Sequence, residues 1–163
     1  MDLADRASIE RLLATVGRVD AVVCAAGPAR FGPLAGLTDD DFRFSLVNKL
    51  MGQVNLARLA SGTLADGGSI TLTSGILARK PMPGGAAISL VNAGLEGFVR
   101  AAALEMPRNI RINVVSPGWV TETLKVLNMD LAQGTPAATV ARAYSESVEG
   151  KRSGEVIEAA GGR

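Results

Sequence analysis

Polar side chains that could do chemistry follow one of the short apolar segments of the sequence. Ser74 ends the segment 69–74, and Arg79 and Lys80 lie on the loop after it. In open parallel sheets, ligand sites lie at the carboxyl ends of the strands. A hydroxyl there could hydrogen-bond a substrate, or could only satisfy the backbone groups of a turn. The two cations are candidates for contact with an anionic substrate or cofactor, with a solvated loop as the alternative.

The composition argues against several kinds of site. The 163 residues include no histidine and one cysteine, Cys24, so the sequence predicts no metal site and no internal disulfide. Cys24 lies in an apolar segment and is expected to be an inert core residue. Lys and Arg number 17 against 16 Asp and Glu, which argues against a nucleic-acid partner. Without a signal peptide or an apolar stretch of ~18 residues, the expected localisation is cytoplasmic, with no membrane contact.

Apolar periodicity predicts helices that alternate with short strands in one domain, 1–163. Helices are expected at about 5–17, 39–64, 85–105 and 135–150, and strands at 19–26, 69–74, 110–115 and 155–159. Asp5 and Thr38 are the expected N-caps of the first two helices. The alternating order indicates a parallel sheet with right-handed crossovers and helices on both faces.

Six motifs then follow one another in the order found in one enzyme family. They are Cys24-Ala25-Ala26-Gly27, Asn48, Leu72-Thr73-Ser74-Gly75, the segment 92–98, the segment 111–118, and the closing segment 153–157 with Gly161-Gly162. In this order the chain resembles the short-chain dehydrogenases/reductases over essentially its whole length. The resemblance implies an α/β fold, a Rossmann-like doubly wound parallel sheet in three α/β/α layers.

The resemblance also implies a function and a set of site residues. It implies hydride transfer between NADP or NAD and a small-molecule carbonyl or alcohol. Ser74 would hydrogen-bond the substrate oxygen, and Asn48 would bridge its helix backbone and an active-site water, although both could be purely structural. The implied cofactor-binding residues are Asp2, Leu3, Ala25, Ala26, Gly27, Asn92, Pro117, Gly118, Val120 and Thr121.

Two positions depart from the family pattern. Ile88 and Asn92 occupy the places of the family's catalytic tyrosine and lysine. Ile88 cannot donate a proton, and Asn92 keeps hydrogen-bonding capacity for a ribose but carries no charge. Loss of a positioned general acid typically costs ~10²–10⁴ in rate. A non-catalytic nucleotide-binding or regulatory protein is therefore an open alternative. Tyr144, the only tyrosine, is expected to be a packing or surface residue rather than a displaced proton donor.

The family's opening strand, Gly-rich turn and helix do not precede the first strand of this sequence. Asp2-Leu3 resembles the pair that ends the family's third strand, so the sheet is expected to be N-terminally truncated. The chain is then a fragment, a natural short form that pairs its open edge, or an oligomerisation module without ligand. NADP or NAD binding is expected of the complete protein. The helices near 39–64 and 85–105 would pair in a homodimer or homotetramer.

Overall fold

The computed structural model describes residues 1–159, and the predicted closing Gly161-Gly162 lies outside them. Its strands, within the described residues, are β1 (Val19–Val23), β2 (Leu64–Thr73), β3 (Arg111–Pro117) and β4 (Val156–Ala159). Its α-helices are α1 (Arg6–Val16), α2 (Asp39–Ser45), α3 (Gly52–Ala60), α4 (Ala86–Ala102), α5 (Thr121–Val126) and α6 (Ala137–Glu149). Short 3₁₀ turns occupy Leu34–Gly36, Ile76–Ala78 and Leu131–Gln133, and a π-helix occupies Leu46–Met51.

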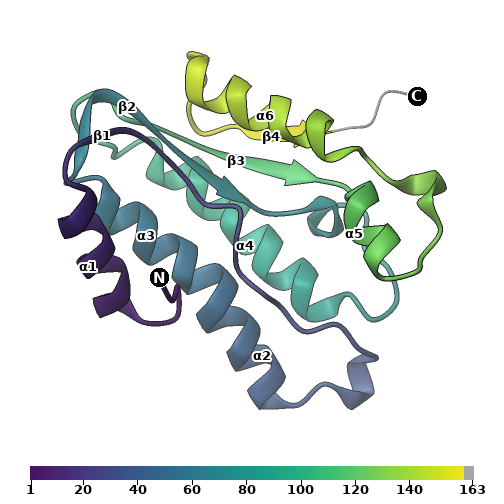
Figure 1. Cartoon of the computed structure of the whole chain (residues 1–163). Coiled ribbons are helices and arrows are strands. Elements are labelled where there is room, and N and C mark those ends of the chain that lie inside the picture. Colours follow the sequence, from purple (N-terminus) through teal and green to yellow (C-terminus); the bar gives the residue numbers. More distant parts are fainter. Residues whose placement is uncertain (160–163) are drawn as a thin grey trace.

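The strands of the described region form one parallel sheet in the order β1-β2-β3-β4. Because each strand pairs with the next along the chain, every connection is a crossover that carries a helix (Figure 1). This confirms the predicted Rossmann-like parallel α/β fold. The carboxyl ends of β1, β2 and β3 therefore meet at one edge of the sheet.

Helices cover the two faces of the sheet unequally, which gives the predicted three layers. On one face α1, α3 and α4 pack against Ile70 and Leu72 of β2, which are fully buried. On the other face α6 packs against Val115 and Ile157. This helix lies above the sheet in Figure 1. Burying a side chain of this size contributes about 1.5–3 kcal/mol, so these two clusters fix how the helices sit on the sheet.

The predicted caps are present, whereas several predicted boundaries are wrong. Asp5 accepts a hydrogen bond from the Ala7 backbone, and Thr38 forms a capping box with Asp41. The helix predicted to reach residue 64 ends at Ala60, because Leu64 is fully buried and pairs with Val19 as the start of β2. The first predicted strand, 19–26, ends at residue 23, and the sequence did not predict α5.

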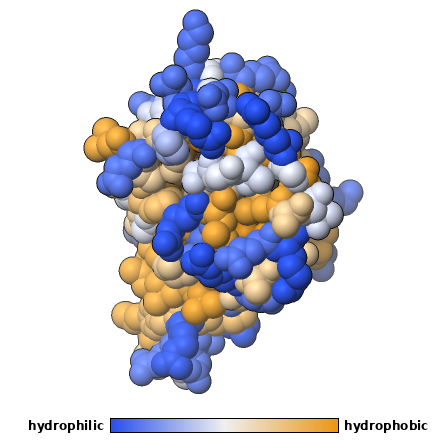
Figure 2. All heavy atoms as spheres, turned by 90° about the vertical axis from the view of Figure 1, so that its left-hand side faces the viewer, coloured by the Kyte–Doolittle hydropathy of each residue, from blue (hydrophilic) through white to orange (hydrophobic). Residues whose placement is uncertain are grey.

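Strand β1 lies at an edge of the sheet and is incompletely covered. Val23 lies beside Thr71 in the register, and Thr71 hydrogen-bonds Ser147 of α6, so both residues are on the α6 face. Val23 nevertheless keeps 47% of its surface exposed. Figure 2 shows hydrophobic surface on the face that corresponds to the left-hand side of Figure 1. Among the described residues no helix is long and apolar enough to cross a membrane.

Candidate active site

The turns that follow β1, β2 and β3 converge at the carboxyl edge of the sheet. Pro117, the last residue of β3, and Gly118 line a cavity of about 170 Å³ together with Ser74 and Gly75 after β2. The helices that approach this cavity contribute Lys49, Ile88 and Asn92 to its walls. This is the place where open α/β sheets bind ligands, so we take it as the candidate site.

The helix beside this cavity changes its winding where it passes the site. Residues 46–51 form a π-helix between α2 and α3. Asn48 lies in this segment, and its Nδ2 donates a hydrogen bond to the Phe44 carbonyl at 2.9 Å. π-helical turns widen the helix and are frequent at functional sites. This contact fits both the structural alternative and the predicted bridge from the helix backbone, so the catalytic role of Asn48 stays a prediction.

Gly27 lets the turn after β1 pack directly on this π-helix. Its φ of +123° is a backbone conformation that favours glycine, and a Cβ there would lie 3.0 Å from the Lys49 Cα. The same Cβ would lie 3.2 Å from the Lys49 Cγ. The predicted cofactor turn Ala25-Ala26-Gly27 is thus in contact with the residue that enters the cavity.

Gln53 attaches the same helix to the end of β2. Its Nε2 donates to the Thr73 carbonyl at 2.9 Å, and its Oε1 accepts from the Thr73 backbone N–H at 2.8 Å. Lys49 precedes Gln53 by four residues and faces the same strand end. Its Nζ donates to the Ser74 carbonyl at 3.2 Å. Burial, offset in part by nearby Cys24, lowers the pKa of Lys49 to about 8.

The hydroxyl of the predicted catalytic serine is hydrogen-bonded to a carboxylate of α4. Ser74 is 2% exposed, and its Oγ donates to Glu96 of α4 at 3.2 Å. Arg79 lies 3.7 Å from the same buried carboxylate and also forms an ion pair with Glu158 of β4. These contacts hold the loop after β2 against both α4 and the last strand. One of the two cations singled out in the sequence is therefore engaged in structural ion pairs.

Asn92 carries a buried polar atom that the described residues leave without a partner. The residue is 1% exposed, and its Nδ2 donates to the Gly75 carbonyl in a long contact of 3.4 Å. Its Oδ1 has no hydrogen-bond partner within residues 1–159. A Cβ at Gly75 would come within 2.9 Å of the Asn92 Nδ2, so only glycine fits there without a shift. An unpaired buried carbonyl oxygen typically costs ~1–3 kcal/mol, which a ligand hydroxyl would offset.

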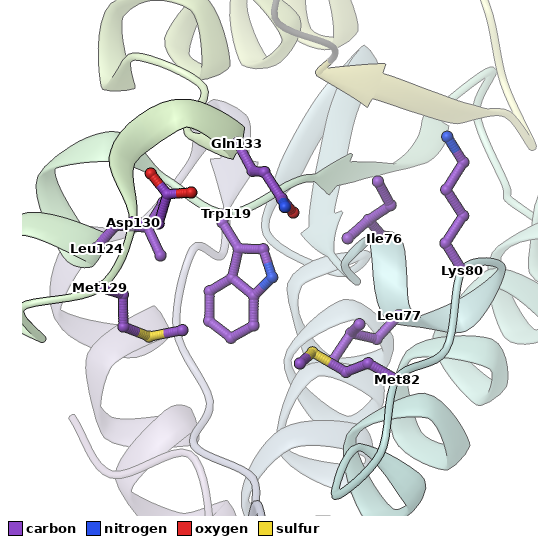
Figure 3. A pocket seen from close by; sticks show the side chains of 9 residues that line it. All are labelled: Ile76, Leu77, Lys80, Met82, Trp119, Leu124, Met129, Asp130 and Gln133. Atoms are coloured by element: carbon purple, nitrogen blue, oxygen red, sulfur yellow. The ribbon is translucent and has the colours of Figure 1, made fainter.

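A larger apolar pocket of about 390 Å³ adjoins this cavity. It shares Ile76, Leu77 and Trp119 with the smaller one. Figure 3 shows the Trp119 ring between two groups of side chains, which come from the loop after β2 and from the segment that contains α5. The full lining is Ile76, Leu77, Lys80, Met82, Trp119, Leu124, Met129, Asp130 and Gln133. The polar cavity thus opens beside a mainly apolar one.

The remaining predicted site residues lie in several places. Leu3 is buried in the core, and its Cβ lies 2.8 Å from where a Cβ would stand on Gly52 of α3. Asp2 accepts a hydrogen bond from the Ala4 backbone. Val120 forms a bridge with Thr135, and the Thr121 backbone N–H donates to the Thr135 carbonyl.

The two residues predicted to have packing roles are buried or partly buried at the end of β1. Cys24 is a core residue, as predicted, and burial raises the pKa of its thiol. Tyr144 hydrogen-bonds the Thr73 hydroxyl at 2.6 Å, and that hydroxyl donates to the Cys24 carbonyl at 2.6 Å. Burial raises the pKa of Tyr144. The described residues contain no group of three or more acidic, cysteine or histidine side chains that could hold a metal ion.

Sequence comparison and structure comparison agree on one class of protein. The family model described as enoyl-(acyl carrier protein) reductase matches residues 1–157. A human 3-oxoacyl-[acyl-carrier-protein] reductase is 37% identical over 116 residues, which cover 69% of this chain and 49% of that protein. The chain belongs to the short-chain dehydrogenase/reductase family. It spans about half the length of the curated relatives it matches.

Solved structures superimpose closely on the chain. The crystal structure of a protein from Listeria innocua has a TM-score of 0.93 and 41% sequence identity, and the match covers 97% of this chain and 80% of that one. A small-chain dehydrogenase crystallised in complex with NADPH has a TM-score of 0.88 and 26% identity, with 99% of this chain and 81% of that one covered. These matches confirm the fold that the six sequence motifs predicted.

Proposed function

We propose that the protein is an NADP(H)- or NAD(H)-dependent oxidoreductase that interconverts a carbonyl and an alcohol of a small molecule. The observation that carries the proposal is the Asn92 Oδ1, which is buried in the cavity wall without a partner among residues 1–159. An acceptor in this position can receive a ribose hydroxyl. When bound, the dinucleotide supplies or takes up the hydride.

The residues around the cavity fit the nicotinamide end of such a cofactor. Gly75 and Gly118 have no side chain, so a flat ring can approach the backbone beside Asn92. The complexes of related dehydrogenases with NADPH and NADP support the choice of ligand. The turn Ala25-Ala26-Gly27 would face the adenosine half, as the family resemblance implies. NADP(H) is our first choice because both of these neighbours were crystallised with it.

The apolar pocket supports a substrate with an apolar body. Its walls are mainly aliphatic, aromatic and thioether side chains, as Figure 3 shows, and they would remove such a substrate from water. The reacting carbonyl would lie where this pocket meets the smaller cavity, near Trp119. Lys80, Asp130 and Gln133 supply the polar groups of the pocket. The volume of about 390 Å³ admits a ligand of ordinary metabolite size.

Replacing Asn92 by leucine is expected to weaken NADPH binding about tenfold, because one ligand hydrogen bond is lost. Titration of the protein with NADPH and with NADH, followed by nucleotide fluorescence, measures the change and shows which dinucleotide binds. Asn55→Leu in α3 is the matched control and should bind as the unmodified protein does. If neither dinucleotide binds the unmodified protein, the proposed function is wrong.

A nucleotide-binding protein without catalysis is the second candidate, and Ile88 favours it. Ile88 lines the cavity where the family has its proton donor, and its side chain cannot exchange a proton. Binding of NADPH with no turnover over a broad panel of aldehydes and ketones would favour this candidate. Measurable reduction of any member of the panel would exclude it.

We also propose that the described fold is part of one Rossmann-fold domain that assembles as a homodimer or homotetramer through α2 to α4. The open edge of the sheet at β1 supports the proposal that the fold is part of a larger domain. Exposed apolar side chains on these helices support the proposed assembly. Val47, Met51 and Leu90 keep 39%, 41% and 48% of their surfaces exposed. Light scattering is expected to give a multiple of 16.8 kDa, and Leu90→Glu should lower it. A monomeric unmodified protein would contradict the assembly.

A further inference from the structure

The cavity lacks the family's proton donor but contains one other group that can exchange a proton. Several of its walls are backbone turns, which have no ionisable group. The side chains of Ile88, Asn92 and Trp119 also have none near neutral pH. Lys49 is the lining residue with an ionisable side chain among those the structure describes. It comes from a different helix than the one that carries the family's tyrosine and lysine.

Lys49 is held in place, yet most of its hydrogen-bonding capacity is unused within residues 1–159. The ammonium has three donors, and the described residues provide one acceptor, the Ser74 carbonyl. No carboxylate of the described chain lies within 4.0 Å of the Nζ, in contrast to the paired Arg79. Gln53 and Gly27 fix the helix on both sides of the residue. A positioned, uncompensated cation at a cavity wall suits a group that acts on a ligand.

We propose that Lys49 is the acid–base catalyst of this site and donates the proton that the substrate oxygen needs; this rests on the proposed oxidoreductase function. In the reducing direction the carbonyl carbon gains a C–H bond with the electron pair from NADPH. The carbonyl π-bond breaks, and the oxygen takes a proton from the Lys49 Nζ. The neutral amine regains its proton from solvent. In the oxidising direction the neutral amine removes the hydroxyl proton.

The electrostatic surroundings of Lys49 suit this role. Its pKa of about 8 leaves the amine mainly protonated at pH 7, and a general acid works best with a pKa near the working pH. Cys24 after β1 is the titratable group that acts on it, and burial raises the pKa of that thiol. Glu96 of α4 lies behind the Ser74 hydroxyl and is paired with Arg79. Tyr144 of α6 reaches Thr73 on the other side of the strand end.

The test compares Lys49→Met, Lys49→Arg and the control Lys151→Met, an exposed lysine in the loop before β4. We expect both Lys49 variants to lose about 10²–10⁴-fold in kcat for NADPH-dependent ketone reduction, because neither side chain can donate a proton near neutral pH. NADPH affinity should stay within about threefold by fluorescence titration. Lys151→Met should match the unmodified protein in both measurements.

A second measurement reports on Lys49 without any turnover. Competitive acetylation with acetic anhydride, followed by peptide mass spectrometry, gives an apparent pKa for each of the lysines 49, 80, 125 and 151. Lys49 is expected near 8, because burial disfavours its charged form. Saturation with NADP⁺, whose nicotinamide ring is cationic, should lower the Lys49 value further, whereas NADPH should not. A lysine that does not lie beside the nicotinamide would not distinguish the two ligands.

The outcomes separate the two proposals. If the unmodified protein binds neither NADPH nor NADH, the proposed function is overturned. Reduction that survives Lys49→Met overturns the assignment of Lys49 and leaves the function intact. Activity retained by Lys49→Arg also overturns it, because a permanent cation would then suffice. Circular dichroism of each variant shows that the fold is intact before the rates are compared.

Discussion

Lys49→Met is expected to stabilise the fold by about 2 kcal/mol at pH 7. Burial holds the pKa of Lys49 at about 8 against 10.5, which corresponds to about 3 kcal/mol against the charged form in the folded state. Methionine has a similar length and no charge, so it removes this penalty. It also removes the hydrogen bond to the Ser74 carbonyl, and the loss of this bond offsets about 1 kcal/mol of the gain in stability. Urea unfolding at pH 7 measures the difference.

The same variant should change how stability depends on pH. Between about pH 8 and 10.5 the unfolded chain keeps the Lys49 proton and the folded chain loses it, so the unmodified protein gains stability as pH rises. The advantage of Lys49→Met should therefore be full below pH 8 and largely gone above pH 10.5. Subtracting the two curves removes the opposite contributions of Cys24 and Tyr144, whose pKa values are raised. A pH-independent difference would show that the amine is not desolvated.

Gln53→Met is expected to destabilise the protein by about 2–5 kcal/mol. The Gln53 side chain hydrogen-bonds both the backbone N–H and the backbone carbonyl of Thr73. Thr73 lies past the point where β1 stops pairing with β2. Each buried backbone group left unpaired costs about 1–3 kcal/mol, and methionine keeps the packing volume. Urea unfolding measures the loss, with Gln133→Met as control, since Gln133 is exposed in the apolar pocket rim. A change below ~0.5 kcal/mol would mean that water replaces the amide.

The fold was largely predictable because its signals are local. Alternating apolar segments and the Asp5 and Thr38 caps predict elements that depend on a few neighbouring residues. The six motifs then gave the family and its Rossmann-like parallel sheet. The predicted helix end at 64 was wrong because the helix ends at Ala60 and the polar turn Ser61-Gly62-Thr63 separates it from β2. Leu64 satisfies a helical pattern as well as a strand.

The candidate site was less predictable because it depends on backbone geometry that residue types do not show. The π-helix at residues 46–51 adds a residue to one turn, so 3.6-residue periodicity cannot tell which side chain faces the cavity. The sequence singled out Arg79 and Lys80, on the loop after Ser74, whereas the structure places Lys49 in the cavity wall. Ser74 and Gly75 are adjacent, and adjacent residues at a strand end point in different directions. The Ser74 hydroxyl reaches Glu96, whereas the Gly75 position faces Asn92.

The ion pairs of Arg79 make the two walls of the apolar pocket unequal. One wall, Ile76 to Met82, includes Arg79, which forms ion pairs with Glu96 of α4 and Glu158 of β4. The other wall, Leu124 to Gln133, lies in the segment between Val120 and Thr135. These two residues are paired by an isolated β-bridge. Insertions and substitutions in the second wall would leave Lys49 and Asn92 untouched. The size of ligand that the apolar pocket admits can therefore change over evolution, or by design, without rebuilding the smaller cavity beside it.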